Sequence, residues 1–144
     1  MIDIDIESLY KILCILETSN LLINYDSELS INDYKALRTI QSYSPHCPIQ
    51  AIGKSLNITK SGATRFINRL EKSGLIKKYL SPNDGRVCCI VLTEKGNATH
   101  QKASNHCKNE IQKKLTNLNK EDTSQINNSL KYILLSINNN RNED

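Results

Sequence analysis

Apolar residues recur at helical spacing between residues 59 and 75, and this pattern predicts one amphipathic helix. Its inward stripe consists of Ala63, Phe66, Ile67 and Leu70. The opposite side carries short hydrogen-bonding side chains mixed with cations, namely Lys60, Ser61, Thr64, Arg65 and Asn68. Thr59 is a suitable N-cap and Gly74 a suitable C′ residue, so both ends of the helix are marked.

A shorter helix is predicted from Pro48 to Leu56, followed by a tight turn at Asn57. Asn tolerates the left-handed dihedral angles that such a turn needs. Gly53 supplies a small contact where the two helices meet. The pattern favours a helix-turn-helix, and the alternative is an ordinary helical hairpin inside an all-helical core.

Two apolar runs follow at residues 75–80 and 87–92, separated by a dense turn signal at residues 81–85. We interpret them as two strands joined by a polar loop, which is a wing placed directly after a candidate recognition helix. Thr93 then caps a further helix.

The segments before this module are typical of helices. We expect a first helix over about residues 5–22, with Cys14 in its core face, and a second over about residues 31–43. The inward positions of the second helix are Tyr34, Leu37 and Ile40. Two prolines, Pro45 and Pro48, end the second helix, and a short extended segment before Ile49 could join the wing sheet.

Two helices are also expected after the wing. The first covers about residues 94–117 and has a narrow apolar seam at Ala103, Cys107, Ile111 and Leu115. The second begins after a cap at Asn119, and its apolar stripe is too wide for a solvated surface. The stripe consists of Ile126, Leu130, Ile133, Leu134 and Ile137. Residues 138–144 form a polar tail that we expect to be disordered.

Three short motifs carry a family resemblance: Asn-Arg-Leu-Glu-Lys-Ser-Gly-Leu-Ile at residues 68–76, Asp-Gly-Arg at 84–86 and Leu-Thr-Glu-Lys-Gly at 92–96. In this order and spacing, the sequence resembles the MarR family of winged helix-turn-helix regulators. The close match covers roughly residues 49–96, and the flanking helices fit in kind and order only.

The resemblance implies a fold that is mainly α with a small β-wing, in a single domain over residues 1–144. The winged helix-turn-helix would span about residues 31–96, with dimerisation helices at about 5–22 and 94–138. It also implies a homodimer that binds double-stranded DNA, often with repression relieved by a small molecule, a metal or an oxidant. The alternative for the first and last helices is that they pack only within the monomer.

Charge is distributed unevenly along the chain. Residues 1–34 carry seven acidic residues against Lys11, a net charge of −6, whereas residues 47–95 carry nine cations against three acids, a net charge of +6. A solvated helix face is the simplest explanation of such a run. Its coincidence with the helix-turn-helix favours phosphate contacts, which supply most non-specific affinity for DNA.

The exposed face of the recognition helix gives specific expectations. Ser61, Thr64 and Arg65 should face base edges in the major groove, and Lys60 and Asn68 should reach phosphate or a flanking base. In the wing, Arg86 should enter the minor groove, with the Asp84 carboxylate orienting its guanidinium.

Five cysteines, at positions 14, 47, 88, 89 and 107, raise the question of a thiol sensor. Cys107, beside His106 and near Lys108, is the first candidate, and Cys47 is the second. His106 and Glu110 are one helical turn apart and could share a ligand. We favour the competing interpretation, in which the cysteines are packing residues and the effector is a small organic molecule.

No metal site or cofactor is indicated by the spacing of the cysteines, and Cys88 and Cys89 point to opposite faces of a strand.

Several function classes are excluded by what the sequence lacks. It has no phosphate-binding loop and no nucleophile elbow, so an enzyme is not expected. It also has no secretory signal and no membrane-spanning run, so we expect a cytoplasmic protein. The remaining candidates are a ligand-responsive repressor on a pseudo-palindromic operator, a cysteine-based redox or metal sensor of the same fold, and a winged-helix module for protein–protein interaction.

Overall fold

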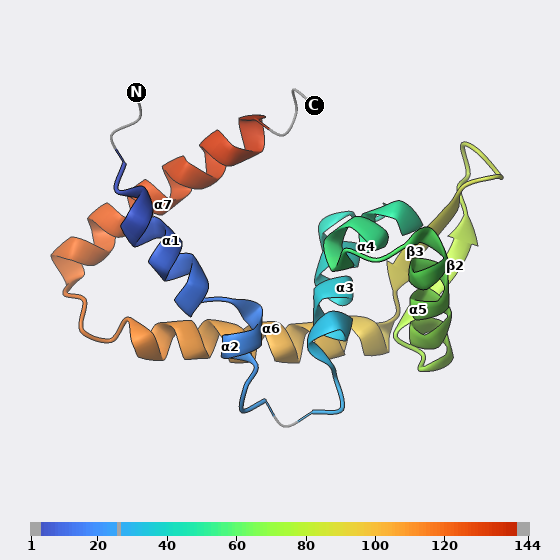
Figure 1. Ribbon diagram of the computed structural model, residues 1–144, viewed down its shortest axis with the longest axis horizontal. Coiled ribbons are helices and arrows are strands. Elements are labelled where there is room, and N and C mark those ends of the chain that lie inside the picture. The colour runs from blue at the N-terminus through green and yellow to red at the C-terminus, as the bar shows by residue number, and fades with distance from the viewer. Residues whose placement is uncertain (1–3, 26, 141–144) are drawn as a thin grey trace. The chain divides into compact units, whose positions relative to one another are not determined.

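The computed structural model describes residues 4–25 and 27–140, and the chain divides into two compact units. The first covers residues 1–110 and the second residues 111–144. The elements of the first unit are α1 (Ile6–Ile15), α2 (Thr18–Leu21), α3 (Ile31–Ser42), β1 (Cys47–Pro48), α4 (Ile49–Leu56), α5 (Lys60–Lys72), β2 (Ile76–Leu80) and β3 (Cys88–Leu92) (Figure 1). Helix α6 (Glu94–Lys114) runs through the boundary, and α7 (Lys120–Asn140) belongs to the second unit.

The turn between α4 and α5 has the geometry that its residues predict. Asn57 adopts the left-handed conformation, with φ 52° and ψ 48°. The Thr59 hydroxyl accepts a hydrogen bond from the backbone N–H of Gly62 at 3.1 Å and caps α5. At the other end of α5, Gly74 has φ +76°, as a C′ glycine does. The predicted helix-turn-helix is confirmed.

The wing belongs to a three-stranded antiparallel sheet in the order β1-β3-β2. Strands β2 and β3 pair from Ile76 opposite Leu92 to Leu80 opposite Cys88, and β1 pairs Cys47 with Ile90. Figure 1 shows the β2–β3 hairpin projecting beyond α4 and α5. The short extended segment expected before Ile49 is therefore β1, and it ties the start of α4 to the wing.

The core of the first unit lies among α3, α4, α5 and the sheet. Its largest fully buried side chains are Leu37, Ile40, Cys47, Ile52, Ile67, Leu70, Ile76 and Ile90. Burying one large aliphatic side chain of this kind contributes roughly 1.5–3 kcal/mol. This core fixes α5 and the wing relative to each other, because both contribute to it.

Helix α6 begins in close contact with the α5–β2 turn. The Thr93 hydroxyl accepts a hydrogen bond from Gly96 N–H at 3.0 Å and donates to the Gly74 carbonyl at 2.6 Å. A Cβ atom on Gly96 would lie 1.9 Å from the Leu75 carbonyl oxygen. Only glycine allows the two backbones to approach this closely.

The first helix differs from the prediction, because the segment expected to be one helix over residues 5–22 is divided into α1 and α2. The chain is extended at Glu17, with φ −57° and ψ 140°. The Asn20 side-chain amide donates to the Cys14 carbonyl at 2.9 Å, and Arg38 donates to the Thr18 hydroxyl at 3.2 Å. Short polar side chains at residues 18–20 thus replace helical backbone hydrogen bonds with local and tertiary ones.

Other boundaries were also predicted wrongly. Helix α6 ends at Lys114, before the expected residue 117, and Leu115 is 49% exposed. Helix α7 extends to Asn140, so residues 138–140 are helical, and residues 141–144 lie outside the described part of the chain.

Helices α1 and α7 have no buried residues in the single chain. Their exposed apolar side chains include Ile6, Tyr10, Leu13, Leu130 and Leu134. Cys14, expected in the core face of the first helix, is exposed for the same reason. Across the described residues, no helix has the length and apolar character needed to cross a membrane.

Candidate nucleic-acid interface

The outer face of α5 carries all five polar side chains that the sequence assigns to it. Lys60, Ser61, Thr64, Arg65 and Asn68 are each exposed. The Thr64 hydroxyl donates to the Lys60 carbonyl at 3.1 Å, so its oxygen remains an acceptor toward solvent. Ser61 and Thr59 hydroxyls lie 3.3 Å apart at the start of the helix. This face can offer both donors and acceptors to an extended polar partner.

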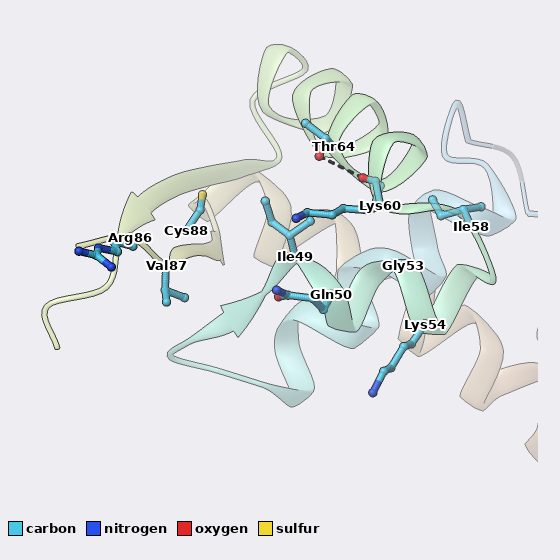
Figure 2. A pocket seen from close by; sticks show the side chains of 11 residues that line it. Ile49, Gln50, Gly53, Lys54, Ile58, Lys60, Thr64, Arg86, Val87 and Cys88 are labelled. Atoms are coloured by element: carbon cyan, nitrogen blue, oxygen red, sulfur yellow. Dashed lines mark hydrogen bonds between the residues drawn. The ribbon is translucent and has the colours of Figure 1, made fainter. Parts of the chain in front are cut away.

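A groove of about 420 Å³ lies between α4, the first half of α5 and the end of the wing turn where β3 begins. Figure 2 shows Gln50 on α4 and Lys60 on α5 facing this space, with Arg86 at its edge on the wing. Its cations are Lys54, Lys60 and Arg86, its uncharged polar groups include Gln50 and Thr64, and its apolar lining includes Ile49, Ile58, Ala63 and Val87. A concave surface bordered by cations suits a polyanion.

Gln50 and Lys54 were not among the expected site residues. They stand on α4, which was predicted only as the first helix of the helix-turn-helix, although their exposed positions could be identified from the helical spacing. In helix-turn-helix proteins the first helix crosses the DNA backbone, so polar residues on its outer face were the available signal.

The wing turn is organised differently from the prediction for Asp84 and Arg86. The Asp84 carboxylate accepts a hydrogen bond from the backbone N–H of Arg86 at 3.0 Å, and no ion pair with the guanidinium is present among the described residues. The Asp84 carbonyl also accepts from Val87 N–H at 3.0 Å. Asp84 therefore shapes the turn, and the Arg86 side chain extends from it exposed.

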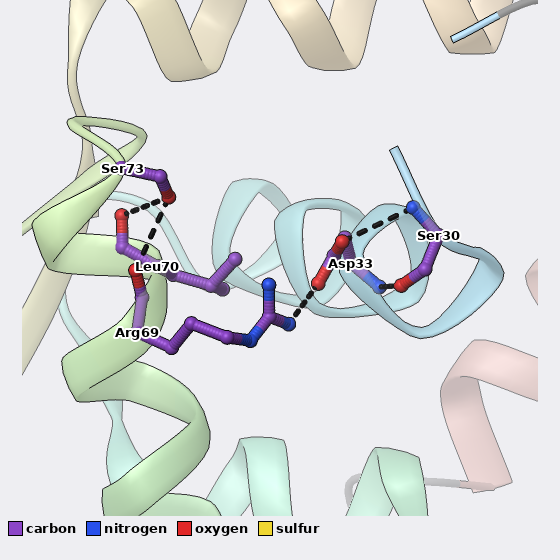
Figure 3. Close-up of polar contacts among 5 residues, drawn as sticks. All are labelled: Ser30, Asp33, Arg69, Leu70 and Ser73. Carbon is purple, nitrogen blue, oxygen red and sulfur yellow. Dashed lines mark hydrogen bonds and ion pairs between the residues drawn. The ribbon is translucent and has the colours of Figure 1, made fainter. Parts of the chain in front are cut away.

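The far end of α5 is tied to α3 by an ion pair between Arg69 and Asp33. Asp33 is 5% exposed and forms a capping box with Ser30 (Figure 3). The Ser30 hydroxyl accepts a hydrogen bond from the Asp33 N–H, and the Asp33 carboxylate accepts one from the Ser30 N–H, each 3.1 Å long. The Arg69 guanidinium also lies over the Phe66 ring, 4.8 Å from its centroid. Arg69 was counted among the cations of the basic region; its side chain is 54% exposed, but its charge is paired with the buried carboxylate of Asp33.

A second cation of this region is compensated as well. The Lys78 ammonium, on β2, donates to the Asn68 side-chain oxygen at 2.7 Å and lies 3.0 Å from the Glu71 carboxylate. The hydrogen bond from Lys78 lowers the pKa of Glu71. The cations of the basic region thus divide into those paired with a carboxylate of the protein, such as Arg69 and Lys78, and those that form no ion pair among the described residues, such as Lys60 and Arg65.

The two candidate sensor thiols are both buried. Cys47 is 0% exposed, and burial raises its pKa to about 11. Burial likewise raises the pKa of Cys107. A reactive thiol must be accessible and partly ionised, and neither cysteine meets this condition in the single chain. No group of three or more metal-binding side chains occurs among residues 4–25 and 27–140.

An aromatic and histidine cluster connects α3 with α6. The rings of Tyr34 and His100 stack with centroids 5.8 Å apart, and the Arg38 guanidinium lies 5.7 Å from the Tyr34 centroid. Nearby, the Tyr25 and His106 centroids are 4.9 Å apart, and the buried His106 Nε2 has no hydrogen-bond partner among the described residues. The sequence did not predict this cluster, because its members come from three separate segments.

A family model and two known transcriptional regulators match this chain. A family model described as "MarR family" matches residues 29–88. The transcriptional repressor MprA of Escherichia coli (strain K12) is 31% identical over 134 residues, which cover 86% of this chain and 76% of that protein. The HTH-type transcriptional regulator BilQ of Clostridioides difficile (strain CD3) is 30% identical over 96 residues, covering 62% of this chain and 63% of that protein.

The fold also matches solved structures. A mutant of MepR from S. aureus, bound to an oligodeoxyribonucleotide, superposes with a TM-score of 0.58 and 19% identity. The match covers 94% of this chain and 99% of that one.

Proposed function

Because this chain belongs to the MarR family of transcriptional regulators, we propose that it is a ligand-responsive repressor that binds a pseudo-palindromic DNA operator as a homodimer. The observation that carries the proposal is the exposed polar face of α5 beside a groove whose cations come from α4, α5 and the wing. The oligonucleotide-bound MepR mutant supports it, because that protein binds DNA on the same fold. The name of MprA supports repression.

In this proposal α5 enters the major groove. Ser61, Thr64 and Arg65 contact base edges, and Lys60 neutralises phosphate at the groove margin. The Arg86 side chain reaches the minor groove, where narrow A·T segments have a strong negative potential. Gln50 and Lys54 on α4 contact the phosphates that flank the major groove.

The dimer would be formed by α1 and α7. Both helices expose apolar stripes in the single chain, and exposed patches of this kind mark interaction sites. A two-fold axis would place two recognition helices on half-sites about 10–10.5 bp apart or a multiple of that distance.

The effector in this proposal is a small organic molecule. The aromatic and histidine cluster that joins α3 and α6 supports it, because the buried His106 Nε2 has no hydrogen-bond partner among the described residues and could bond a polar group of a ligand. The burial of Cys47 and Cys107 makes a thiol sensor the weaker alternative.

The test is DNA binding measured over a range of salt concentrations, followed by selection of sites from a random DNA library. We expect Arg65→Ala to weaken operator binding by about 5- to 150-fold, the value of an arginine–guanine pair, with a much smaller loss on random DNA. Lys102→Ala, which removes the same charge from the exposed face of α6, is the control. Equal losses on both DNAs would make Arg65 a phosphate contact, and no binding of wild type at low salt would disprove the proposal.

A further inference from the structure

The side-chain amide of Asn68 is held from outside its own helix. Asn68 lies on the outer face of α5, one turn after Thr64 and Arg65. Its Oδ1 accepts a hydrogen bond of 2.7 Å from Nζ of Lys78, which stands on the neighbouring strand β2. The DNA-facing helix and the wing strand therefore meet at this amide.

Lys78 is itself held in place by Glu71. Its ammonium lies 3.0 Å from Glu71 Oε2, and its backbone N–H donates to Glu71 Oε1 at 3.3 Å. Both side chains are partly buried, with exposed fractions of 31% for Lys78 and 39% for Glu71. A lysine held at two points cannot follow the Asn68 side chain, so the amide must adapt to the lysine.

The chemistry of the ammonium group decides which way the amide faces. An ammonium has three N–H donors and no acceptor, so it can bond only the oxygen of a carboxamide. The NH₂ group of Asn68 is consequently turned away from Lys78. An unconstrained Asn could present either its oxygen or its nitrogen to a base, whereas this one is restricted.

We propose that Lys78 orients Asn68 as a hydrogen-bond donor toward DNA, so that at the position it contacts Asn68 selects a base with an acceptor on its major-groove edge and rejects cytosine. The acceptors of the major groove are N7 and O6 of guanine, N7 of adenine and O4 of thymine, while the amino group of cytosine offers only a donor. This inference rests on the proposed function, because it assumes that α5 reads DNA. Lys78 is then a positioning residue, and Asn68 makes the contact.

The chain offers a matched control for Lys78. Lys77 is the preceding residue on the same strand, it is exposed, and its side chain points to the opposite face of the sheet. Lys77→Met and Lys78→Met remove the same charge and keep a similar side-chain length. Only Lys78→Met frees the Asn68 amide.

The experiment selects binding sites from a random DNA library with wild type, Asn68→Ala, Lys78→Met and Lys77→Met. We expect wild type and Lys77→Met to share a preference of about five-fold or more for an acceptor-bearing base at one position in each half-site. Asn68→Ala should lose that preference, and Lys78→Met should reduce it by at least about two-fold. Circular dichroism and thermal unfolding confirm that each variant is folded.

A base analogue then tests the atom that is read. Replacing a guanine or adenine at the selected position by its 7-deaza analogue removes the N7 acceptor; where thymine is selected, an analogue lacking O4 serves. The substitution should weaken wild-type binding by about five-fold and leave Asn68→Ala unaffected.

Three results would overturn the inference while the proposed function stands. Asn68→Ala could keep the wild-type preference, Asn68→Ala could lose affinity equally on all sequences as a phosphate contact would, or Lys78→Met could keep the full preference. Absence of any DNA binding by wild type would overturn both proposals together.

Discussion

Similar apolar stripes occur in the winged helix-turn-helix, from α3 to β3, and in the flanking helices α1 and α7. The stripes are buried in the first region and exposed in the second. In the winged part Leu37, Ile67 and Ile90 are completely buried. In α1 and α7 no residue is buried, and Tyr10 and Leu134 are 63% and 60% exposed. An apolar stripe thus predicts that a face will be covered, but it does not say whether the same chain or another one covers it.

The largest effect expected from this comparison is in the core. Leu37→Ala should destabilise the protein by roughly 2–5 kcal/mol, because it removes a fully buried side chain and leaves a cavity. Denaturant unfolding measures the change, and Leu80→Ala, at the exposed end of β2, is the comparison. A loss of less than about 1 kcal/mol at Leu37 would contradict the packing described for α3.

The flanking helices should respond in association rather than in folding. Leu134→Asp should yield monomers, because it removes roughly 1.5–3 kcal/mol of apolar burial from each protomer and introduces an unpaired charge. Sedimentation measures the assembly, and circular dichroism checks that the winged part remains folded. Wild type that sediments as a monomer at micromolar concentration would disprove the proposed dimer.

A smaller effect is expected at the wing. Arg86→Ala should weaken DNA binding and reduce the slope of log affinity against log salt by about one unit, because the variant loses one cation that lies close to the DNA phosphates. Arg69→Ala provides the contrast: its charge is paired with Asp33, so it should lower stability and change the salt slope little. Binding isotherms at several salt concentrations measure both, and an unchanged affinity for Arg86→Ala would leave the wing with a structural role only.

The smallest effect concerns pH. The pKa of Glu71 is lowered from its ordinary value of 4.5 by the hydrogen bond from Lys78. The stabilisation is therefore present above this ordinary value and is lost as pH falls through the lowered pKa of the folded state. The difference in unfolding midpoint between wild type and Glu71→Gln should be full near neutral pH and should shrink steadily as the pH is lowered below the ordinary carboxyl pKa, and a difference that does not change with pH would rule out the ion pair as its cause.

Local features of the winged part were predictable from the sequence because neighbouring residues determine them. Asn57, Thr59 and Gly74 each act within a few residues of their own position, so the turn, the N-cap and the C′ residue were predicted correctly. The sheet followed from the two apolar runs and the turn signal between them.

The features that were missed depend on partners far along the chain. Arg69 is paired with Asp33, which is 36 residues away, and α2 is fixed in part by Arg38, which is 20 residues from Thr18. Nothing in the spacing of the cations distinguishes the ion-paired Arg69 and Lys78 from Lys60 and Arg65, which form no ion pair among the described residues. The Asp84 carboxylate was predicted to bond a side chain and instead bonds the nearest backbone N–H, a local competition that composition does not decide.

The close approach at Gly96 has a consequence for genetics. Any replacement of this glycine places a Cβ atom 1.9 Å from the Leu75 carbonyl oxygen, at the junction where α5 ends and β2 begins. The recognition helix would have to shift for the new side chain to fit. Under the proposed repression, a screen for strains that express the regulated genes constitutively should therefore recover substitutions at Gly96 alongside those at Arg65, although Gly96 carries no side chain with which to contact an operator.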